Sequence, residues 1–160
     1  MIIGLFAVDE AGGIGWKGSM PWPLNKDDMK WFKTTTTGQA VVMGRTTWDS
    51  PDMPSPLPNR LNVVVTSRDI DCENVLCIKG DVIDELKNLQ NLRPDMDIYV
   101  IGGANILQQL KPALQKLYLT RISGEYLSDV KLDTDLYLRR FKLTETLNLG
   151  SCKVEKYEAI

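Results

Sequence analysis

Six short apolar runs divide the chain and predict the strands of a sheet. The first covers residues 1–8 and is apolar at almost every position, which is typical of a strand buried on both faces. The others lie at 40–43, 61–65, 74–78, 97–101 and 116–122. Two later runs, at 141–147 and 153–157, flank the turn-forming sequence Asn-Leu-Gly-Ser and predict a hairpin.

Helical spacing of apolar residues occurs between these runs. It predicts helices over 25–35, 82–92 and 104–110, and a further short helix is expected to begin after Gly44. Strands that alternate with helices are typical of an α/β domain, and the hairpin adds an antiparallel edge. We therefore expect a single domain over residues 1–160: a central, mostly parallel, twisted sheet with an antiparallel C-terminal edge and about four flanking helices.

One carboxylate lies where the helical pattern predicts burial. On an ideal helix, Asp28 shares a face with three large apolar residues, Leu24, Trp31 and Phe32, while Asp27 lies at the margin of that face. A carboxylate on a buried face is costly unless it has a partner or a task, and burial should raise its pKa. Two interpretations stay open at this point. Asp28 either supports an N-terminal cap at Asn25 or is a functional carboxylate.

Composition narrows the chemistry. The 160 residues include no histidine and only three cysteines, without a C-x-x-C pair, and the net charge is −2. We expect no metal site, no disulfide framework, no nucleic-acid partner and no membrane binding. The N-terminal run lacks a basic leader, so we expect a cytoplasmic protein, and nothing in the pattern demands more than a monomer. Without histidine, acid–base chemistry near neutral pH must use a carboxylate of shifted pKa, a water or the ligand itself.

Three strand ends carry groups that suit phosphate. They are Gly44-Arg45-Thr46-Thr47, Thr66-Ser67-Arg68 and Gly102-Gly103. Ligands of open α/β sheets gather at the carboxyl ends of strands, where hydroxyls, guanidinium groups and glycine N–H groups can hold phosphate. Each sequence alone is also typical of an ordinary turn or a solvated arginine. Together they indicate a dinucleotide whose extra phosphate is held by Arg45 and Arg68, although the G-x-G-x-x-G fingerprint is absent.

Seven motifs, spaced over nearly the whole chain, make a more specific pattern. They are I-G at 14–15, M-P-W-x-L at 20–24, D-M-K-W-F-K at 28–33, V-V-M-G-R-x-T-W at 41–48, L-P-N-R at 57–60, V-I-G-G at 100–103 and K-L-Y-L-T at 116–120. In this order and spacing they resemble dihydrofolate reductase of the bacterial and phage type. The resemblance implies an enzyme that uses NADPH to reduce 7,8-dihydrofolate to tetrahydrofolate, which supplies one-carbon carriers for nucleotide synthesis.

The resemblance also implies roles at the substrate end of the site. Asp28 would hydrogen-bond the pterin, supported by Thr120, and Arg60 would clamp the α-carboxylate of the glutamate tail. The walls around the pterin and the aminobenzoyl ring would be Ile3, Leu5, Met29 and Phe32. The charge of Asp28 would polarise the ring while a water, admitted near Met20 and Trp22, delivers a proton to N5.

The implied cofactor residues fall into three groups. The adenosine end would be held by Gly44, Arg45, Thr46, Thr47, Thr66, Ser67, Arg68 and Lys79. The diphosphate and the nicotinamide would face Gly102, Gly103, Ala104, Asn105, Ile106 and Leu107, with Leu5 nearby. The loop from Gly13 to Met20, including Ile14, Gly15 and Ser19, resembles the lid that closes over the nicotinamide.

Some positions depart from the family pattern, and two other functions stay open. Leu107 replaces a common tyrosine, Asn105 a common arginine and Asn59 a usual glycine. We therefore expect some contacts to the cofactor and to the glutamate tail to differ from those of typical family members. One alternative is a pyrimidine reductase of riboflavin synthesis, which shares this fold. The other is a pteridine- or NADPH-binding protein of low activity with a structural role.

Overall fold

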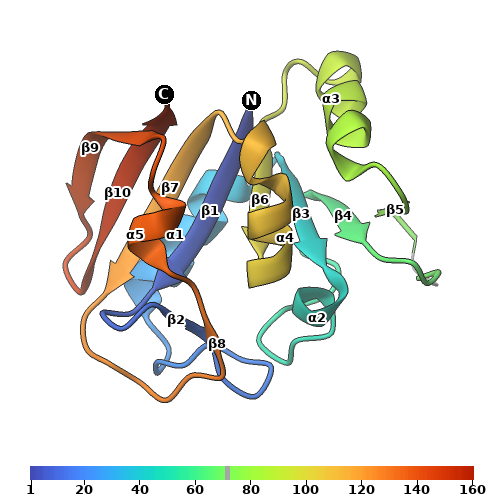
Figure 1. Ribbon diagram of the computed structural model, residues 1–160. Helices are drawn as coiled ribbons and strands as arrows, with labels where there is room; N and C mark the ends of the chain where they lie inside the picture. Colours follow the sequence, from blue (N-terminus) through green and yellow to red (C-terminus); the bar gives the residue numbers. More distant parts are fainter. Residues whose placement is uncertain (71–72) are drawn as a thin grey trace.

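The computed structural model describes residues 1–70 and 73–160, and an eight-stranded sheet forms its centre (Figure 1). The strand order is β5-β4-β3-β6-β1-β7-β10-β9. Neighbours from β5 to β7 are paired parallel, whereas β10 is antiparallel to both β7 and β9. The bounds are β1 Ile2–Val8, β3 Ala40–Gly44, β4 Leu61–Val65, β5 Val75–Ile78, β6 Ile98–Gly102, β7 Lys116–Ile122, β9 Phe141–Asn148 and β10 Cys152–Ala159. The predicted parallel sheet with an antiparallel C-terminal edge is therefore confirmed.

The helices agree with the sequence except where they are very short. The four expected helices are α1 Lys26–Thr36, α2 Arg45–Trp48, α3 Val82–Leu92 and α4 Ala104–Leu110. Not predicted were α5 Thr134–Tyr137, the 3₁₀ turn η1 Lys111–Ala113 and a separate two-stranded ribbon of β2 Gly13–Gly15 with β8 Val130–Lys131. Elements of two to four residues are too short to show a hydrophobic period.

Strand β1 explains how the helices are distributed over the two faces of the sheet. Its side chains alternate, so that Ile2 and Val8 join one buried cluster while Ile3 and Leu5 join the other. The first cluster includes residues of α3 and α4, and the second receives Trp31 and Phe32 of α1. In Figure 1, α4 accordingly lies in front of the sheet and α1 behind it.

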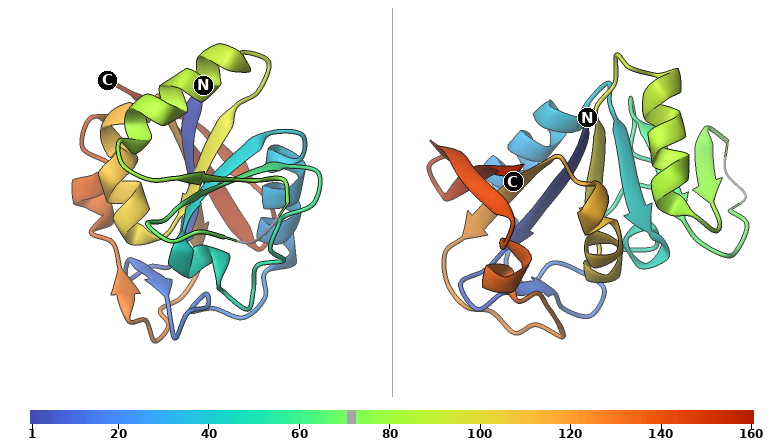
Figure 2. Two further views of the ribbon diagram at one scale, coloured as in Figure 1. Left: turned by 90° about the vertical axis from the view of Figure 1, so that its right-hand side faces the viewer. Right: turned by 45° about the horizontal axis from the view of Figure 1, so that its top comes forward.

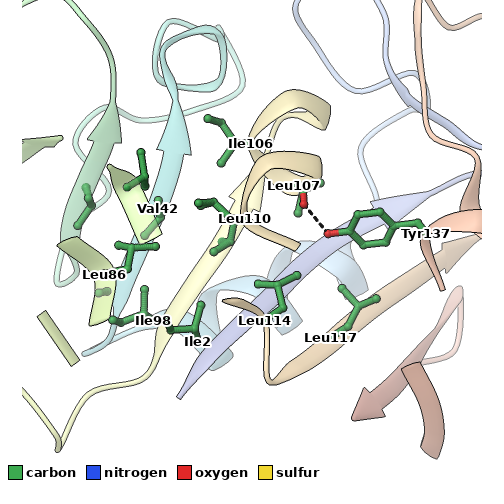
Figure 3. Packing of buried hydrophobic residues seen from close by; sticks show 14 of the residues in the cluster. Ile2, Val42, Leu86, Ile98, Ile106, Leu107, Leu110, Leu114, Leu117 and Tyr137 are labelled. Carbon is green, nitrogen blue, oxygen red and sulfur yellow. Dashed lines mark hydrogen bonds between the residues drawn. The ribbon is translucent and has the colours of Figure 1, made fainter. Parts of the chain in front are cut away.

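Tyr137 closes the first cluster from the C-terminal side. This residue of α5 is 1% exposed, and its hydroxyl donates a hydrogen bond of 2.8 Å to the carbonyl of Leu107 on α4 (Figure 3). The ring also packs edge-on against Phe6 and stacks with Phe141. The short α5 is thus tied directly to the helix that follows β6.

The carboxyl ends of the parallel strands lie along the lower edge of the sheet in Figure 1. Helix α2 and the β2–β8 ribbon border this edge, while α3 lies toward the other end, as both views of Figure 2 show. No helix in the described ranges is long and apolar enough to cross a membrane. The strand-end sequences that were expected to bind phosphate, at Gly44, Thr66 and Gly102, therefore lie at this carboxyl edge.

Candidate active site

Helix α1 presents its two aspartates to different partners. Asn25 caps the helix by accepting the Asp28 N–H at 2.9 Å, so the predicted cap is confirmed. Asp27 accepts hydrogen bonds from the backbone N–H of Ser151 at 3.1 Å and from its hydroxyl at 2.7 Å. Asp27 therefore connects α1 to the β9–β10 turn. Asp28 lies partly buried and faces Thr120 of β7 instead.

The two carboxyl groups are shifted in opposite directions. Burial raises the pKa of Asp28, and a hydrogen bond from the Thr120 hydroxyl partly opposes the rise. The Ser151 hydroxyl, followed by its backbone N–H, lowers the pKa of Asp27. Thr120 itself is 1% exposed, so its hydroxyl is held in the interior. The raised pKa expected from the helix face is confirmed for Asp28.

The apolar residues near Asp28 form only part of the predicted wall. Ile3 and Leu5 are 2% and 3% exposed, in the cluster against which Phe32 packs. Met29 is 47% exposed, so nearly half of this residue is accessible. The prediction for Leu24 was wrong: it precedes the cap, lies outside the helix and is 65% exposed.

Arg60 is held by its neighbours before any ligand binds. Its Nε donates to the carbonyl of Pro58 at 3.0 Å, and one terminal nitrogen donates to the Thr36 hydroxyl at 3.3 Å. The guanidinium group lies 5.9 Å from the centre of the Phe32 ring, and partial burial lowers its pKa. Asn59 has φ 60, a left-handed conformation that asparagine tolerates better than most residues, which explains how it stands where glycine is usual. The two hydrogen bonds to Pro58 and Thr36 use Nε and one of the two terminal nitrogens of Arg60.

The phosphate-binding candidates lie side by side at the carboxyl edge. Gly44 at the end of β3 pairs with Val65 of β4, and Met43 pairs with Gly102 of β6. Thr66 directly follows β4, and its backbone N–H donates a hydrogen bond to the carbonyl of Ile78 at the end of β5, just before Lys79. The structure thus brings the three strand-end sequences together in the order β4, β3, β6, as expected from a parallel sheet.

The cations at this edge are held in different ways. Arg45 Nε donates to Asp49 at 3.0 Å, and one terminal nitrogen of Arg45 is buried with no partner among the described residues. Lys79 pairs with Asp69 at 2.6 Å on the exposed surface. Arg68 is exposed, and its backbone N–H donates to the Thr66 hydroxyl at 3.1 Å.

The three glycines at the carboxyl edge differ in the space around them. A Cβ on Gly102 or Gly103 would lie 3.8 Å from the Thr47 hydroxyl oxygen, so Thr47 faces this pair, whose peptide bond is cis. A Cβ on Gly44 would lie 2.9 Å from a carbon of Ile106, too close to be accommodated without a shift. The buried, unpartnered nitrogen of Arg45 and the bare glycine backbone together fit a phosphate-bearing cofactor.

Leu107 lies in the core beside the expected cofactor residues. Its side chain is 1% exposed, its N–H donates to Gly103 at 3.0 Å, and its carbonyl accepts the Tyr137 hydroxyl. Both backbone polar groups of Leu107 are therefore engaged. The neighbouring Ala104 and Asn105 are less buried, and the contact of Leu107 with the cofactor stays a prediction.

The loop before α1 is anchored by residues that the motifs did not reveal. The buried carboxylate of Asp9 accepts N–H bonds from Ala11 at 2.9 Å, Gly13 at 2.8 Å and Tyr126 at 3.1 Å. Asp129 accepts the Lys17 N–H at 3.0 Å and donates its own to Gly15 at 2.9 Å. Aspartates in glycine-rich loops are common, so no pattern in the sequence distinguishes these two.

Met20 and Trp22 lie together at the end of this loop. Trp22 is 6% exposed and forms a small cluster with Ile122 and Cys152, against which Met20 packs. The Trp22 indole N–H is buried and has no acceptor in residues 1–70 or 73–160. It is a donor available to a small polar molecule at this point of the site.

Neither metal ligands nor a disulfide contributes to the described site. In the part of the chain that the structure covers, no cluster of cysteine and carboxylate side chains is arranged to hold a metal ion. Cys77 and Cys152 are free thiols, and Cys72 lies outside the described residues.

Comparisons with known proteins agree with this geometry. The family model for dihydrofolate reductase matches residues 1–158. The dihydrofolate reductase of Bacillus subtilis is 38% identical over 131 residues, 81% of this chain and 73% of that protein. That of Lactococcus lactis is 31% identical over 172 aligned positions, 100% of this chain and 98% of the relative.

A solved structure extends the match to three dimensions. Dihydrofolate reductase from Enterococcus faecalis, in complex with NADP(H) and RAB-propyl, superposes with a TM-score of 0.80 at 28% identity, covering 99% of this chain and 96% of the other. The chain therefore belongs to the dihydrofolate reductase family.

Proposed function

We propose that this protein carries out the reaction of its family, the NADPH-dependent reduction of 7,8-dihydrofolate to 5,6,7,8-tetrahydrofolate. The carboxyl edge of the sheet binds the cofactor, and helix α1 binds the pterin. The observation that carries the proposal is the partly buried carboxylate of Asp28, hydrogen-bonded by Thr120 and placed beside a glycine-rich edge suited to phosphates. NADPH supplies the hydride, which goes to C6 of the pterin, and N5 must gain a proton.

Asp28 binds and polarises the pterin. Its carboxylate accepts hydrogen bonds from the 2-amino group and from N3, and Thr120 keeps one carboxylate oxygen in place. The negative charge on this side of the ring makes N5 a better proton acceptor. Asp28 need not touch N5, because a water between Met20 and the free Trp22 indole N–H delivers the proton.

Arg60 binds the far end of the substrate. Thr36 and Pro58 fix the guanidinium plane, so that its remaining N–H groups meet the α-carboxylate of the glutamate tail without a large loss of side-chain freedom. Phe32 covers one face of Arg60 and lines the path between tail and pterin. The wall of this path is made by Ile3, Leu5, Met29 and Phe32.

The edge of the sheet holds the cofactor. Arg45 and Arg68 take the extra phosphate on the adenosine, and Thr66, Ser67 and Lys79 complete that end. The bare backbone at Gly102–Gly103 admits the diphosphate, with Gly44, Thr46, Thr47, Ala104, Asn105 and Ile106 around it. The loop residues Ile14, Gly15, Ser19 and Met20 cover the nicotinamide.

The two alternative functions receive less support. The family model and the relatives are those of dihydrofolate reductases, not of a pyrimidine reductase. Asp28, Trp22 and Thr120 are all present, and Asp28 faces Thr120, which favours an active enzyme over a binding protein without turnover. We also propose that residues 1–160 act as one domain, as a monomer in the cytoplasm and without a nucleic-acid partner.

One assay tests the function. Purified protein is mixed with NADPH and with dihydrofolate as the sole acceptor, and the loss of NADPH absorbance is followed with and without an antifolate. We expect turnover that the antifolate abolishes. No turnover, or turnover that an antifolate leaves unchanged, contradicts the proposal. Size-exclusion chromatography with light scattering tests the monomer.

A further inference from the structure

The tip of the loop before α1 is fastened to the loop that follows α2. One carboxylate oxygen of Asp52 accepts a hydrogen bond from the Ser19 hydroxyl and another, at 3.1 Å, from the Met20 backbone N–H. The Ser50 hydroxyl donates to the carbonyl of Gly18 at 2.8 Å, and the Asp52 N–H donates to the Ser50 hydroxyl oxygen at 3.3 Å. Three hydrogen bonds thus join residues 18–20 to residues 50–52.

The tip itself is a tight turn whose shape is set by the backbone. Trp16 and Ser19 exchange N–H···O bonds of 2.8 and 3.0 Å, and Lys17 and Gly18 between them have φ 50 and 79. The two hydrogen bonds between Trp16 and Ser19 close this turn. Contacts that hold Ser19 from outside therefore act on the closed end of the tip.

Met20 connects the tip of the loop to the cluster around Trp22. It follows Ser19 directly, and its side chain packs against the cluster that contains Trp22. Asp52 holds the backbone N–H of that same residue. The carboxylate therefore sets where Met20 lies relative to the indole N–H.

The chemistry of these bonds suits a reversible fastening. Hydrogen bonds to an ionised carboxylate are shorter and stronger than neutral ones, yet Asp52 is exposed, so water can replace it at little cost. The tip is also joined to a different segment through Asp129. Asp52 thus holds Ser19 and Met20, while Asp129 holds Lys17 within the same tip.

We propose that Asp52 is a positioning residue for the reduction: its carboxylate holds Ser19 and Met20 in the conformation that covers the nicotinamide and the reacting face of the pterin. The inference rests on the proposed function of the loop as a lid. Asp52 touches neither ligand and acts only through Ser19 and Met20.

The test compares Asp52→Ala with Asp52→Asn, and Asp84→Ala is the matched control because Asp84 is an exposed aspartate on α3, far from the loop. Hydride transfer is measured in a single turnover with unlabelled and deuterated NADPH, alongside the NADPH dissociation rate and the thermal midpoint. We expect Asp52→Ala to slow hydride transfer and speed NADPH release by about tenfold each, because the variant loses the two hydrogen bonds that this exposed carboxylate accepts from Ser19 and Met20.

The variants separate positioning from a general structural effect. Asp52→Asn keeps an accepting oxygen and should recover most of the rate, while the KM for dihydrofolate and the thermal midpoint stay near wild type in both variants. Combining Asp52→Ala with Ser19→Ala should slow the step little more than either change alone. The inference is overturned if Asp52→Ala transfers hydride at the wild-type rate, if Asp52→Asn is as slow as Asp52→Ala, or if Asp84→Ala has an equal effect.

The activity of the wild-type protein separates a failure of the proposed function from a failure of the role of Asp52. If wild-type protein does not reduce dihydrofolate, the proposed function fails. If it does and Asp52→Ala is unaffected, only the role of Asp52 fails.

Discussion

The Thr120 hydroxyl donates a hydrogen bond to the Asp28 carboxylate, although α1 and β7 are far apart in the sequence. Thr120 lies on β7, which pairs with β1, and Asp28 lies in the first turn of α1 against the same face of the sheet. The hydroxyl opposes the rise that burial causes in the pKa of this carboxylate. Asp27, by contrast, is engaged by Ser151.

Asparagine substitutions should separate the two aspartates. Asp28→Asn removes the charge that polarises the pterin and should lower kcat by about a hundredfold or more. Asp27→Asn alters a surface contact with Ser151 and should leave kcat near wild type. Steady-state kinetics with dihydrofolate and NADPH measure both. Equal losses in the two variants would show that the assignment of Asp28 is wrong.

Thr120→Val should raise the pKa of Asp28 further. The variant removes the hydrogen bond that opposes the effect of burial, while the side chain keeps its shape. Carbon-13 NMR of labelled aspartate should show Asp28 titrating above the ordinary value of 3.8 in the wild type and higher still in the variant. Because a raised folded pKa means tighter proton binding in the folded state, the contribution of Asp28 favours folding at low pH and is lost as the pH rises through that pKa.

Asp27 supplies the internal control for this titration. Its pKa is lowered by Ser151 and should stay below the ordinary value in both proteins. If Asp28 titrates at the same pH in the wild type and in Thr120→Val, the hydroxyl does not influence the carboxylate.

Arg60→Ala should weaken substrate binding without slowing the chemistry. Loss of a charge-assisted contact to the tail carboxylate should raise the KM for dihydrofolate by roughly 10- to 100-fold, with kcat changed far less. Thr36→Val, which removes one support of the guanidinium group, should raise the same KM by a smaller factor. An unchanged KM in Arg60→Ala would remove this residue from the site.

Arg68→Ala should reduce the preference for NADPH over NADH. Arg68 is exposed, and Arg45 is already engaged by Asp49, so the variant should raise the KM for NADPH by about tenfold and leave that for NADH nearly unchanged. Arg139→Ala, which removes an exposed arginine near α5, is the control for a general loss of charge. Equal effects on the two cofactors would contradict the assignment.

The sheet and the position of Asp28 could be predicted because both rest on local patterns. Apolar runs of four to eight residues define the parallel strands, and the cap at Asn25 fixes the phase of α1, which sets Asp28 apart from Asp27. The strand ends then meet in space because carboxyl ends of parallel strands share an edge. The placement of Leu24 failed because the helix begins after it, so helical phase does not apply there.

The remaining features depend on contacts between distant segments. The Asp9 and Asp52 carboxylates are ordinary loop aspartates in the sequence, and only the folded chain brings them to the N–H groups of Gly13 and Met20. The family resemblance implies that Leu107 faces the cofactor. Tyr137, thirty residues later, occupies its carbonyl and helps to bury it.

That last contact predicts where stability can be lost without loss of cofactor binding. Tyr137→Phe leaves the Leu107 carbonyl buried and without its donor, which should cost about 1–3 kcal/mol in the free energy of unfolding. Tyr126→Phe removes a hydroxyl whose bond of 3.3 Å to Ser123 is exposed, and should have little effect. Urea unfolding measures both variants, and the KM for NADPH should stay at the wild-type value in each. If Tyr137→Phe raised that KM while leaving stability intact, the contact between Tyr137 and Leu107 would serve the cofactor site and not stability.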